Sequence, residues 1–462
     1  MMQEVFETLG RLFLRSPRRP KRETTRPRLE QLETRDCPAV LTWTNAAGDG
    51  AWNNPNNWLG GAGPNGPTGS DDVKFDGAYS TANCTFTGAG LTSQDIMANS
   101  ITLTGSYTGT LHLAQPFPAN VGPGGISEAN GDIEQETGQP INDGGDYNWT
   151  GGNLNPNSPF LADLNLTNGK NFNLSSNQDE TTGTNINLKK SPTGGAGATG
   201  TISLPGHTLT FNKDAGINIE DTCTLNLVDG TLATNRFGTI TNAGTLQKTA
   251  GTADFVSALP IANSKMFQLQ AGVLKITGNM GTGQYSFEQT AGTTDLWDGS
   301  YLKLTANFHQ VAGNFWTEGS SAFLSAGVDS SSNIVFDGGV INLNHNNQQG
   351  TGSLSVPRGK LKIQGTTEWD CKLNCDPDNI AWDQISVSAG SLTLGGGQTK
   401  LVAQGFNIPG AGVPEMREWD ILQCINAIGG DFGSTVLDFH DGTLGKWTPG
   451  KRLDDTIYFL KS

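Results

Sequence analysis

The chain has 462 residues with 29 basic and 44 acidic side chains, so its net charge is −15. An acidic chain repels polyanions, which excludes a nucleic acid partner. Charged residues make up only 16% of the chain, and 62 glycines accompany many Asn, Thr and Ser residues. This composition favours short strands joined by turns over helices. A membrane-spanning helix needs about 18 consecutive apolar residues, and no stretch of the chain is that long, so no transmembrane segment is expected.

Residues 1–38 differ in composition from the rest of the chain. The first 36 residues carry nine Lys or Arg and six Asp or Glu. We expect a disordered, basic export or attachment segment, which lacks the uninterrupted apolar stretch of a standard signal peptide. Its Leu29-Glu-Gln-Leu-Glu-Thr-Arg35 stretch resembles the Leu-Glu-x-Leu-Glu-x-Arg motif of many large surface proteins of planctomycete bacteria. The resemblance implies export or attachment to the cell surface.

Residues 39–95 are predicted to form a Trp-rich N-terminal cap. Trp43, Trp52 and Trp58 are followed by Pro64. We expect these tryptophans to plug the end of an apolar core rather than to bind sugars. The segment resembles the start of β-helical passengers in autotransporter-like and planctomycete surface proteins. That resemblance implies a β-helix in the residues that follow.

Residues 96–220 contain short alternating stretches without a clean period, such as Ile101-Thr-Leu103 and Ile202-Ser-Leu204. Alternation of this kind buries one face of a strand. The segment Pro116–Asn148 carries proline, glycine and acidic residues with little alternation. It is predicted to be a long loop that projects from a coil.

A repeat of about 21 residues follows. Its pattern is an apolar residue, three variable residues, a small or acidic residue and a glycine, with intervals of 21, 21, 20 and 21 between successive copies. The regular copies start at Leu225, Leu246, Phe267, Phe287 and Phe308, and further copies start at Tyr147, Ile334 and Ile385. An alternating stretch follows the glycine, so each repeat is predicted to be strand, glycine corner and strand.

This repeat predicts a solenoid. Fully extended, one repeat would span roughly 70 Å, so the chain must turn more than once per repeat. Coils stacked about 4.8 Å apart would pair each backbone with its neighbours and bury a column of Phe and Leu. We therefore predict an all-β, right-handed parallel β-helix over residues 96–365, its hand following from the resemblance and the crossover rule. A propeller does not fit the spacing, and a pair of β-sandwiches does not explain it.

Residues 366–462 are predicted to form the last coils and a C-terminal cap, because a solenoid needs atypical units at both ends. Cys371 and Cys375 lack the partners of a zinc site, and they form either a local disulfide or two free thiols. Asp376, Asp378 and Asp383 are candidate calcium ligands, and an ordinary Asn/Asp turn is the competing interpretation. No other cofactor is indicated.

Stacking the repeats in register predicts two outward columns. One contains Asp254, Lys275, Asp295 and Trp316, an alternating-charge ladder that ends in an aromatic residue. The other contains Gln247, Gln268, Glu288 and His309. Glu288 beside His309 is the candidate general acid/base pair, but we favour a polar ladder that stabilises the stack.

The sequence favours a secreted or cell-surface structural or adhesive protein without catalytic activity. The alternative is a carbohydrate-binding or pectinase-like carbohydrate-cleaving β-helix, with an outer groove flanked by Glu288, His309 and the candidate ligand-binding residue Trp316. Pectinase-like enzymes need clustered acids on a middle coil, and the Asp-Asp pairs of this chain lie in the expected caps. A cell-envelope protein or polysaccharide is the expected kind of partner.

Overall fold

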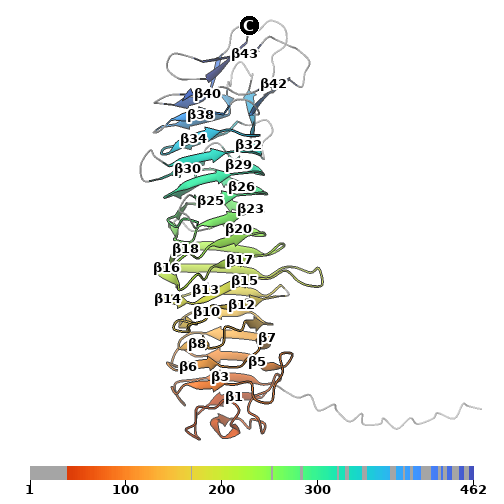
Figure 1. Ribbon diagram of the computed structural model, residues 1–462, viewed down its shortest axis with the longest axis vertical. Coiled ribbons are helices and arrows are strands. Elements are labelled where there is room, and N and C mark those ends of the chain that lie inside the picture. The colour runs from red at the N-terminus through yellow and green to blue at the C-terminus, as the bar shows by residue number, and fades with distance from the viewer. Residues whose placement is uncertain are drawn as a thin grey trace, which may run out of the picture. The chain divides into compact units, whose positions relative to one another are not determined.

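The computed structural model describes residues 39–462 with gaps at 168, 251–252, 281–284, 320–321, 328–331, 346–350, 375–380, 389–390, 396–398, 407–417, 425–427, 430–433, 440–446, 452–456 and 462. The predicted segment 1–38 lies outside this range. Apart from one short 3-10 helix, η1 (Pro55–Asn57), the regular elements of the described residues are strands. The strands pair parallel and stack turn on turn as a β-solenoid, which confirms the predicted fold class (Figure 1).

Each turn of the solenoid passes through three faces, defined here by the strands that pair from one turn to the next. Face 1 contains β1 (Val40–Trp43), β3 (Asp72–Phe75), β5 (Ile96–Leu103), β7 (Ala119–Glu128), β10 (Tyr147–Trp149), β13 (Asn171–Ser175), β16 (Thr199–Phe211), β18 (Thr224–Thr234), β20 (Thr245–Lys248), β23 (Met266–Leu269), β26 (Thr293–Trp297), β29 (Asn314–Glu318), β32 (Val340–Asn342), β35 (Glu368–Asn374), β39 (Lys400–Phe406) and β42 (Ser434–Phe439).

Face 2 follows face 1 around the first corner, and the C-terminal parts of β16 and β18 belong to it. Its other strands are β4 (Cys84–Phe86), β6 (Thr110–Leu113), β8 (Asp132–Gln135), β11 (Asn153–Leu154), β14 (Glu180–Thr182), β21 (Phe255–Ser257), β24 (Val273–Ile276), β27 (Tyr301–Leu304), β30 (Ala322–Ala326), β33 (Ser353–Val356), β37 (Gln384–Val387) and β40 (Glu418–Cys424).

Face 3 closes the turn, and the N-terminal parts of β5 and β7 contribute to it. Its other strands are β9 (Ile141–Asp143), β12 (Ala162–Leu166), β15 (Thr184–Leu188), β17 (Ile217–Ile219), β19 (Ile240–Asn242), β22 (Ile261–Asn263), β25 (Tyr285–Gln289), β28 (Asn307–Gln310), β31 (Asn333–Phe336), β34 (Lys360–Ile363), β38 (Leu392–Leu394) and β41 (Ile428–Gly429).

Antiparallel strands pair with both end regions of the stack. At the N-terminal end, β2 (Trp58–Leu59) pairs with β1. Towards the C-terminal end, β36 (Ala381–Trp382) pairs with β35, and β44 (Ile457–Lys461) pairs with β40 and with β43 (Trp447–Lys451). Such pairing satisfies backbone groups that a parallel stack would leave open at its ends.

The core is a set of apolar columns that run through the coils. On face 3, one column continues from Ile141 through Leu164, Ile186, Ile217, Ile240, Ile261, Phe287, Phe308 and Ile334 to Leu361, and all of these side chains are buried. Each residue of the column covers the one below it at a spacing of about 4.8 Å. Continuous stacking of this kind removes most of the apolar surface from water, which stabilises the solenoid as a whole.

The predicted tryptophans close the N-terminal end of this core. Trp43, Trp52 and Trp58 are buried, and the ring of Trp58 lies 5.0 Å edge-to-face from each of the other two. Phe75 and Phe86 complete the cluster. The burial of these three side chains confirms that they serve as an apolar plug.

The predicted repeat is a corner motif rather than a complete turn. The copies at Leu225, Leu246 and Phe267 pair with one another at intervals of 21 residues, all on face 1. Phe267, however, pairs with Thr294, whereas the next copy, Phe287, lies on face 3. The mean turn is about 25 residues long. A strand, glycine corner and strand therefore recur at different corners, and the period of 21 residues is correct for only part of the stack.

Two of these corner glycines illustrate why the motif needs glycine. Gly313 and Gly339 have φ angles of 89° and 84°, a region that side chains with a β-carbon rarely adopt. A β-carbon on Gly313 would overlap the carbonyl oxygen of Gly292, and one on Gly339 would overlap that of Gly313. The corners of successive coils thus lie too close together for any other residue.

The predicted loop at Pro116–Asn148 is wrong. This segment contains β7, β8, β9 and the start of β10, which pair with the coils on either side. The alternation was hidden because Glu128, Gln135 and Asp143 occupy inward, buried positions where apolar residues were expected. Proline and glycine occur because β7 bends from face 3 to face 1, with shifts of register in its pairing with β5.

The predicted outward columns are correct only in part. Gln247 pairs with Gln268, Glu288 pairs with His309, and Asp295 pairs with Trp316, as expected. Lys275, however, lies on face 2 and pairs with Lys303, whereas Asp295 lies on face 1 and pairs with Gln268. The expected alternating-charge ladder therefore does not form, because the longer turn at Phe267 moves the later copies to another face.

Candidate functional site

The predicted pair Glu288 and His309 lies on the outer side of face 3. The two residues are neighbours on β25 and β28, and Glu288 Oε1 is 3.4 Å from His309 Nδ1. Asp337 Oδ2 is 3.9 Å from His309 Nε2, and the ring of Tyr285 stacks on the imidazole at 4.7 Å. The pair therefore forms as predicted, and it is one part of a row of polar and aromatic side chains.

Trp316 belongs to a different face. It lies on β29 of face 1, where its ring stacks on that of His345 at 3.7 Å with an angle of 6° between the planes. Its neighbour one coil earlier is Asp295, which is almost completely buried. The structure therefore separates Trp316 from Glu288 and His309, and the predicted groove flanked by all three side chains is not formed.

Asp295 is the acidic group with the most altered chemistry near Trp316. Burial raises its pKa to about 6, although a hydrogen bond from Trp297 Nε1 to Oδ2, 3.0 Å long, acts in the opposite direction. Its Oδ1 atom has no hydrogen-bond partner among the described residues. Such a carboxyl group can hold a proton at mildly acidic pH, a property that general acids require.

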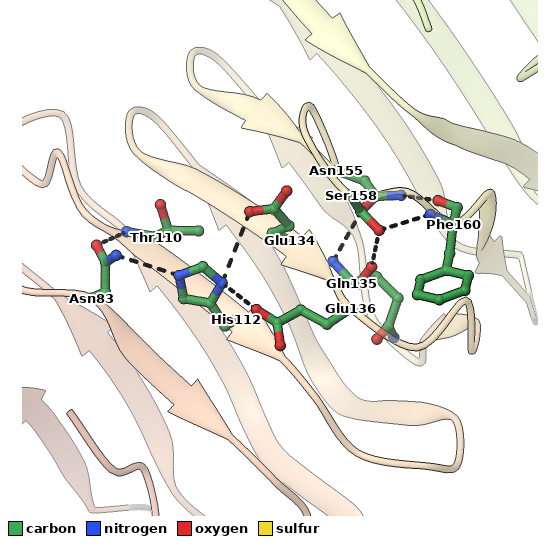
Figure 2. A network of polar contacts seen from close by, with 9 residues as sticks. All are labelled: Asn83, Thr110, His112, Glu134, Gln135, Glu136, Asn155, Ser158 and Phe160. Carbon is green, nitrogen blue, oxygen red and sulfur yellow. Dashed lines mark hydrogen bonds and ion pairs between the residues drawn. The ribbon is translucent and has the colours of Figure 1, made fainter. Parts of the chain in front are cut away.

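A second carboxylate and histidine cluster, which the sequence did not reveal, lies on face 2 (Figure 2). His112 Nδ1 is 2.8 Å from Glu136 Oε1 and 3.9 Å from Glu134 Oε2. Asn83 Nδ2 lies 3.3 Å from His112 Nε2, and Asn83 Oδ1 accepts a hydrogen bond from the backbone N of Thr110. The side chains of His112, Glu134 and Glu136 are partly exposed.

The sequence contained a signal for this cluster. Leu111-His-Leu113 and Ile133-Glu-Gln135 both alternate, which places His112 and Glu134 outward on adjacent strands. The second stretch fell in the segment interpreted as a loop, so its strand was not paired with the first. Correct pairing of the two strands would have been sufficient to predict this neighbour pair.

A buried acid and phenol pair lies inside the coils and is not open to ligands. The Tyr147 hydroxyl donates a 2.5 Å hydrogen bond to Glu128 Oε2, and both side chains are fully buried. Burial raises the pKa of both groups. Because neither group reaches the surface, this pair serves packing rather than catalysis.

The metal and disulfide predictions can be followed only in part. Asp376, Asp378 and Cys375 lie outside the described residues. Asp383 is buried, and its Oδ1 accepts a 2.6 Å hydrogen bond from the backbone N of Gly352. The thiol of Cys371 is free and buried. Among the residues that the structure describes, no cluster of three His, Cys, Asp or Glu side chains is arranged to hold a metal ion, and the calcium site stays a prediction.

The outer sides of the coils therefore carry polar rows in which histidine and carboxylate neighbours occur at two places. No helix within the described part of the chain is long and apolar enough to cross a membrane. Comparisons with protein-family models, with curated proteins and with solved structures give no significant match. The arrangement of side chains is thus the basis for a functional proposal.

Proposed function

We propose that this protein is a structural or adhesive β-helix without catalytic activity that works outside the cell, secreted or attached to its surface. The observation that carries the proposal is an asparagine ladder on the outer side of face 3. It consists of Asn120, Asn142, Asn165, Asn187 and Asn218, which lie in register on five successive coils. From Asn142 onwards, each side-chain amide donates to the side-chain oxygen of the preceding asparagine over 2.7 to 2.9 Å.

This ladder supports a mechanical role. Each inner member both accepts and donates, so the hydrogen bonds polarise one another and hold neighbouring coils in register. On these five coils the outward amides are used within the stack rather than kept for a substrate. A protein built in this way suits a role in which stiffness and resistance to proteases matter more than turnover.

The proposed location rests on the resemblance of Leu29–Arg35 to the surface-protein motif and on the passenger-like N-terminal cap. The direct test is to express the full chain with a C-terminal tag in a planctomycete host and to treat intact cells with protease. We expect the tag to be accessible or released, and replacement of Leu29, Leu32 and Arg35 by alanine should retain the protein inside the cell.

A matched control is available upstream in the same segment. Leu9, Leu12 and Arg15 have the same residue types at the same spacing, and their replacement by alanine should leave export unchanged. A parent protein found only in the cytoplasmic fraction would contradict the proposal.

Carbohydrate cleavage is the second candidate, and the raised pKa of Asp295 next to the Trp316 ring is the observation that favours it. The assay is release of reducing ends from neutral and acidic polysaccharides by the folded full chain. We expect no release. Activity that is lost on D295N, H309A or H112A would overturn the non-catalytic proposal.

A further inference from the structure

A basic groove on face 2 is a feature that the asparagine ladder does not explain. It has a volume of about 370 Å³ and spans the coils that contain β24, β27 and β30. Lys275, Lys303 and Arg358 supply its positive charges, and Tyr301 and Ser325 form part of its wall. The net charge of −15 repels polyanions from the chain as a whole, but the described lining of this groove contains three cations and no Asp or Glu, so the groove is a local exception.

The two lysines are direct neighbours in the stack. Lys275 and Lys303 lie opposite each other on β24 and β27, so their strands are about 4.8 Å apart. Like charges in this position destabilise a sheet. Among the described residues no carboxylate forms an ion pair with either lysine. An anionic ligand would relieve this repulsion, which the fold alone leaves in place.

An aromatic column runs beside the cations. Tyr301 and Phe323 lie opposite each other in register, with ring centroids 5.6 Å apart, and both rings are partly exposed. The Nζ atom of Lys303 lies 4.5 Å from the centre of the Tyr301 ring. The Lys303 ammonium covers one face of the Tyr301 ring, so a pyranose ring that carries an acidic group can pack against the exposed part of the two aromatic rings while its acid meets the cation.

We propose that this groove binds an acidic polysaccharide. Its carboxylate or sulfate groups pair with Lys275 and Lys303 on successive coils, and one of its sugar rings packs against the exposed part of Tyr301. The inference deepens the proposed adhesive function and rests on it, because it names the class of ligand that an adhesive surface would hold.

Affinity electrophoresis of the folded full chain tests the proposal with three polysaccharides. Polygalacturonate supplies carboxylates, dextran sulfate supplies sulfates and dextran is the neutral control. We expect retardation by at least one acidic polymer, decreasing as salt is added, and none by dextran. The acidic polymer that binds more tightly identifies the acidic group. K275E/K303E should weaken binding at least about ten-fold, and Y301A should weaken it less.

The matched control is K360E/K362E, which makes the same change of charge on β34 of face 3. It should change affinity less than about two-fold, because these lysines lie outside the groove. Equal losses in the two double variants would overturn the groove as the site, as would a parent protein that neither acidic polymer retards. Because binding is measured on purified protein, its failure is distinguishable from failure of export.

Discussion

The asparagine ladder on face 3 and the lysine pair on face 2 have the same geometry but opposite energetic consequences. In both, identical side chains lie opposite each other on neighbouring coils. An asparagine is donor and acceptor at once, so a stack of asparagines satisfies itself. A lysine carries a positive charge and has no acceptor, so two stacked lysines repel each other and cannot satisfy each other. The first arrangement therefore needs no ligand, and the second is the basis of the proposed ligand site.

The largest expected change in the free energy of unfolding comes from disturbing the stacking of coils, on which both the asparagine ladder and the lysine pair depend. Gly313→Ala combines a φ of 89° with an overlap between the new β-carbon and the carbonyl oxygen of Gly292. It should lower the free energy of unfolding by at least about 4 kcal/mol, measured by urea denaturation. Gly206→Ala is the control, since Gly206 has a φ of 77° with open space around it. Gly206→Ala should lower the free energy of unfolding by about 1 kcal/mol. If the two variants were destabilised equally, backbone strain alone would explain the corner glycines.

Next in size is a pH effect inside the coil that carries Asn142. The neighbouring Asp143 is buried, and burial raises its pKa to about 6. Because the pKa of Asp143 is higher in the folded protein, its carboxyl group adds stability at pH values below 3.8, the pKa in the unfolded chain. This stability is lost as the pH rises to about 6. In D143N that loss is absent. The stability of D143N relative to the parent should therefore increase by about 2.4 kcal/mol from pH 4 to pH 7. A difference that does not vary with pH would contradict this assignment.

The ladder itself is tested by Asn187→Asp. Asn187 is 4% exposed, donates to Asn165 and accepts from Asn218. Aspartate would keep the second bond but place an oxygen against the Asn165 oxygen, at a cost of about 2 kcal/mol at pH 7. Thermal unfolding measures this cost. Asn173→Asp is the control on face 1, where the bond to Asn148 is isolated and exposed, and its melting temperature should change much less.

The smallest expected effect distinguishes the lysine pair from the ladder. Lys275→Glu replaces a like-charge neighbour of Lys303 by an opposite charge, so the protein should melt at an unchanged or slightly higher temperature, by about 1 °C. Calorimetry at low salt measures the difference, which should decrease at high salt. A clear loss of stability would show that Lys275 is part of the structural framework rather than of a binding groove.

The sequence predicted the architecture because the physical signals of a parallel stack are local and repeated. A glycine corner followed by alternating residues was sufficient to place Phe287 and Phe308 in the core and Glu288 beside His309. The face on which each copy lies could not be predicted in the same way. That depends on the length of each turn, so Lys275 was placed beside Asp295 instead of Lys303.

The misread segment at Pro116–Asn148 has a different cause. Its inward positions carry Glu128, Gln135 and Asp143, so the apolar pattern that identifies a strand is missing although the strands are present. The cluster around His112 was missed for the same reason. A search for alternating apolar residues misses a strand whose inward side chains are polar, so this part of the solenoid could not be recognised from the sequence.

The recurrence of one corner motif on different faces has a consequence for folding kinetics. A growing stack could add a coil that is rotated by one face, because the apolar residues of face 1 and face 3 are interchangeable in size and type. Such a misregistered coil would still bury its core and would be a kinetic trap. In the coils from Asn120 to Asn218 the asparagine ladder distinguishes the two outcomes, because a coil rotated by one face would lose its amide hydrogen bonds. We therefore expect the asparagine ladder to favour the correct alignment of these coils as the solenoid elongates.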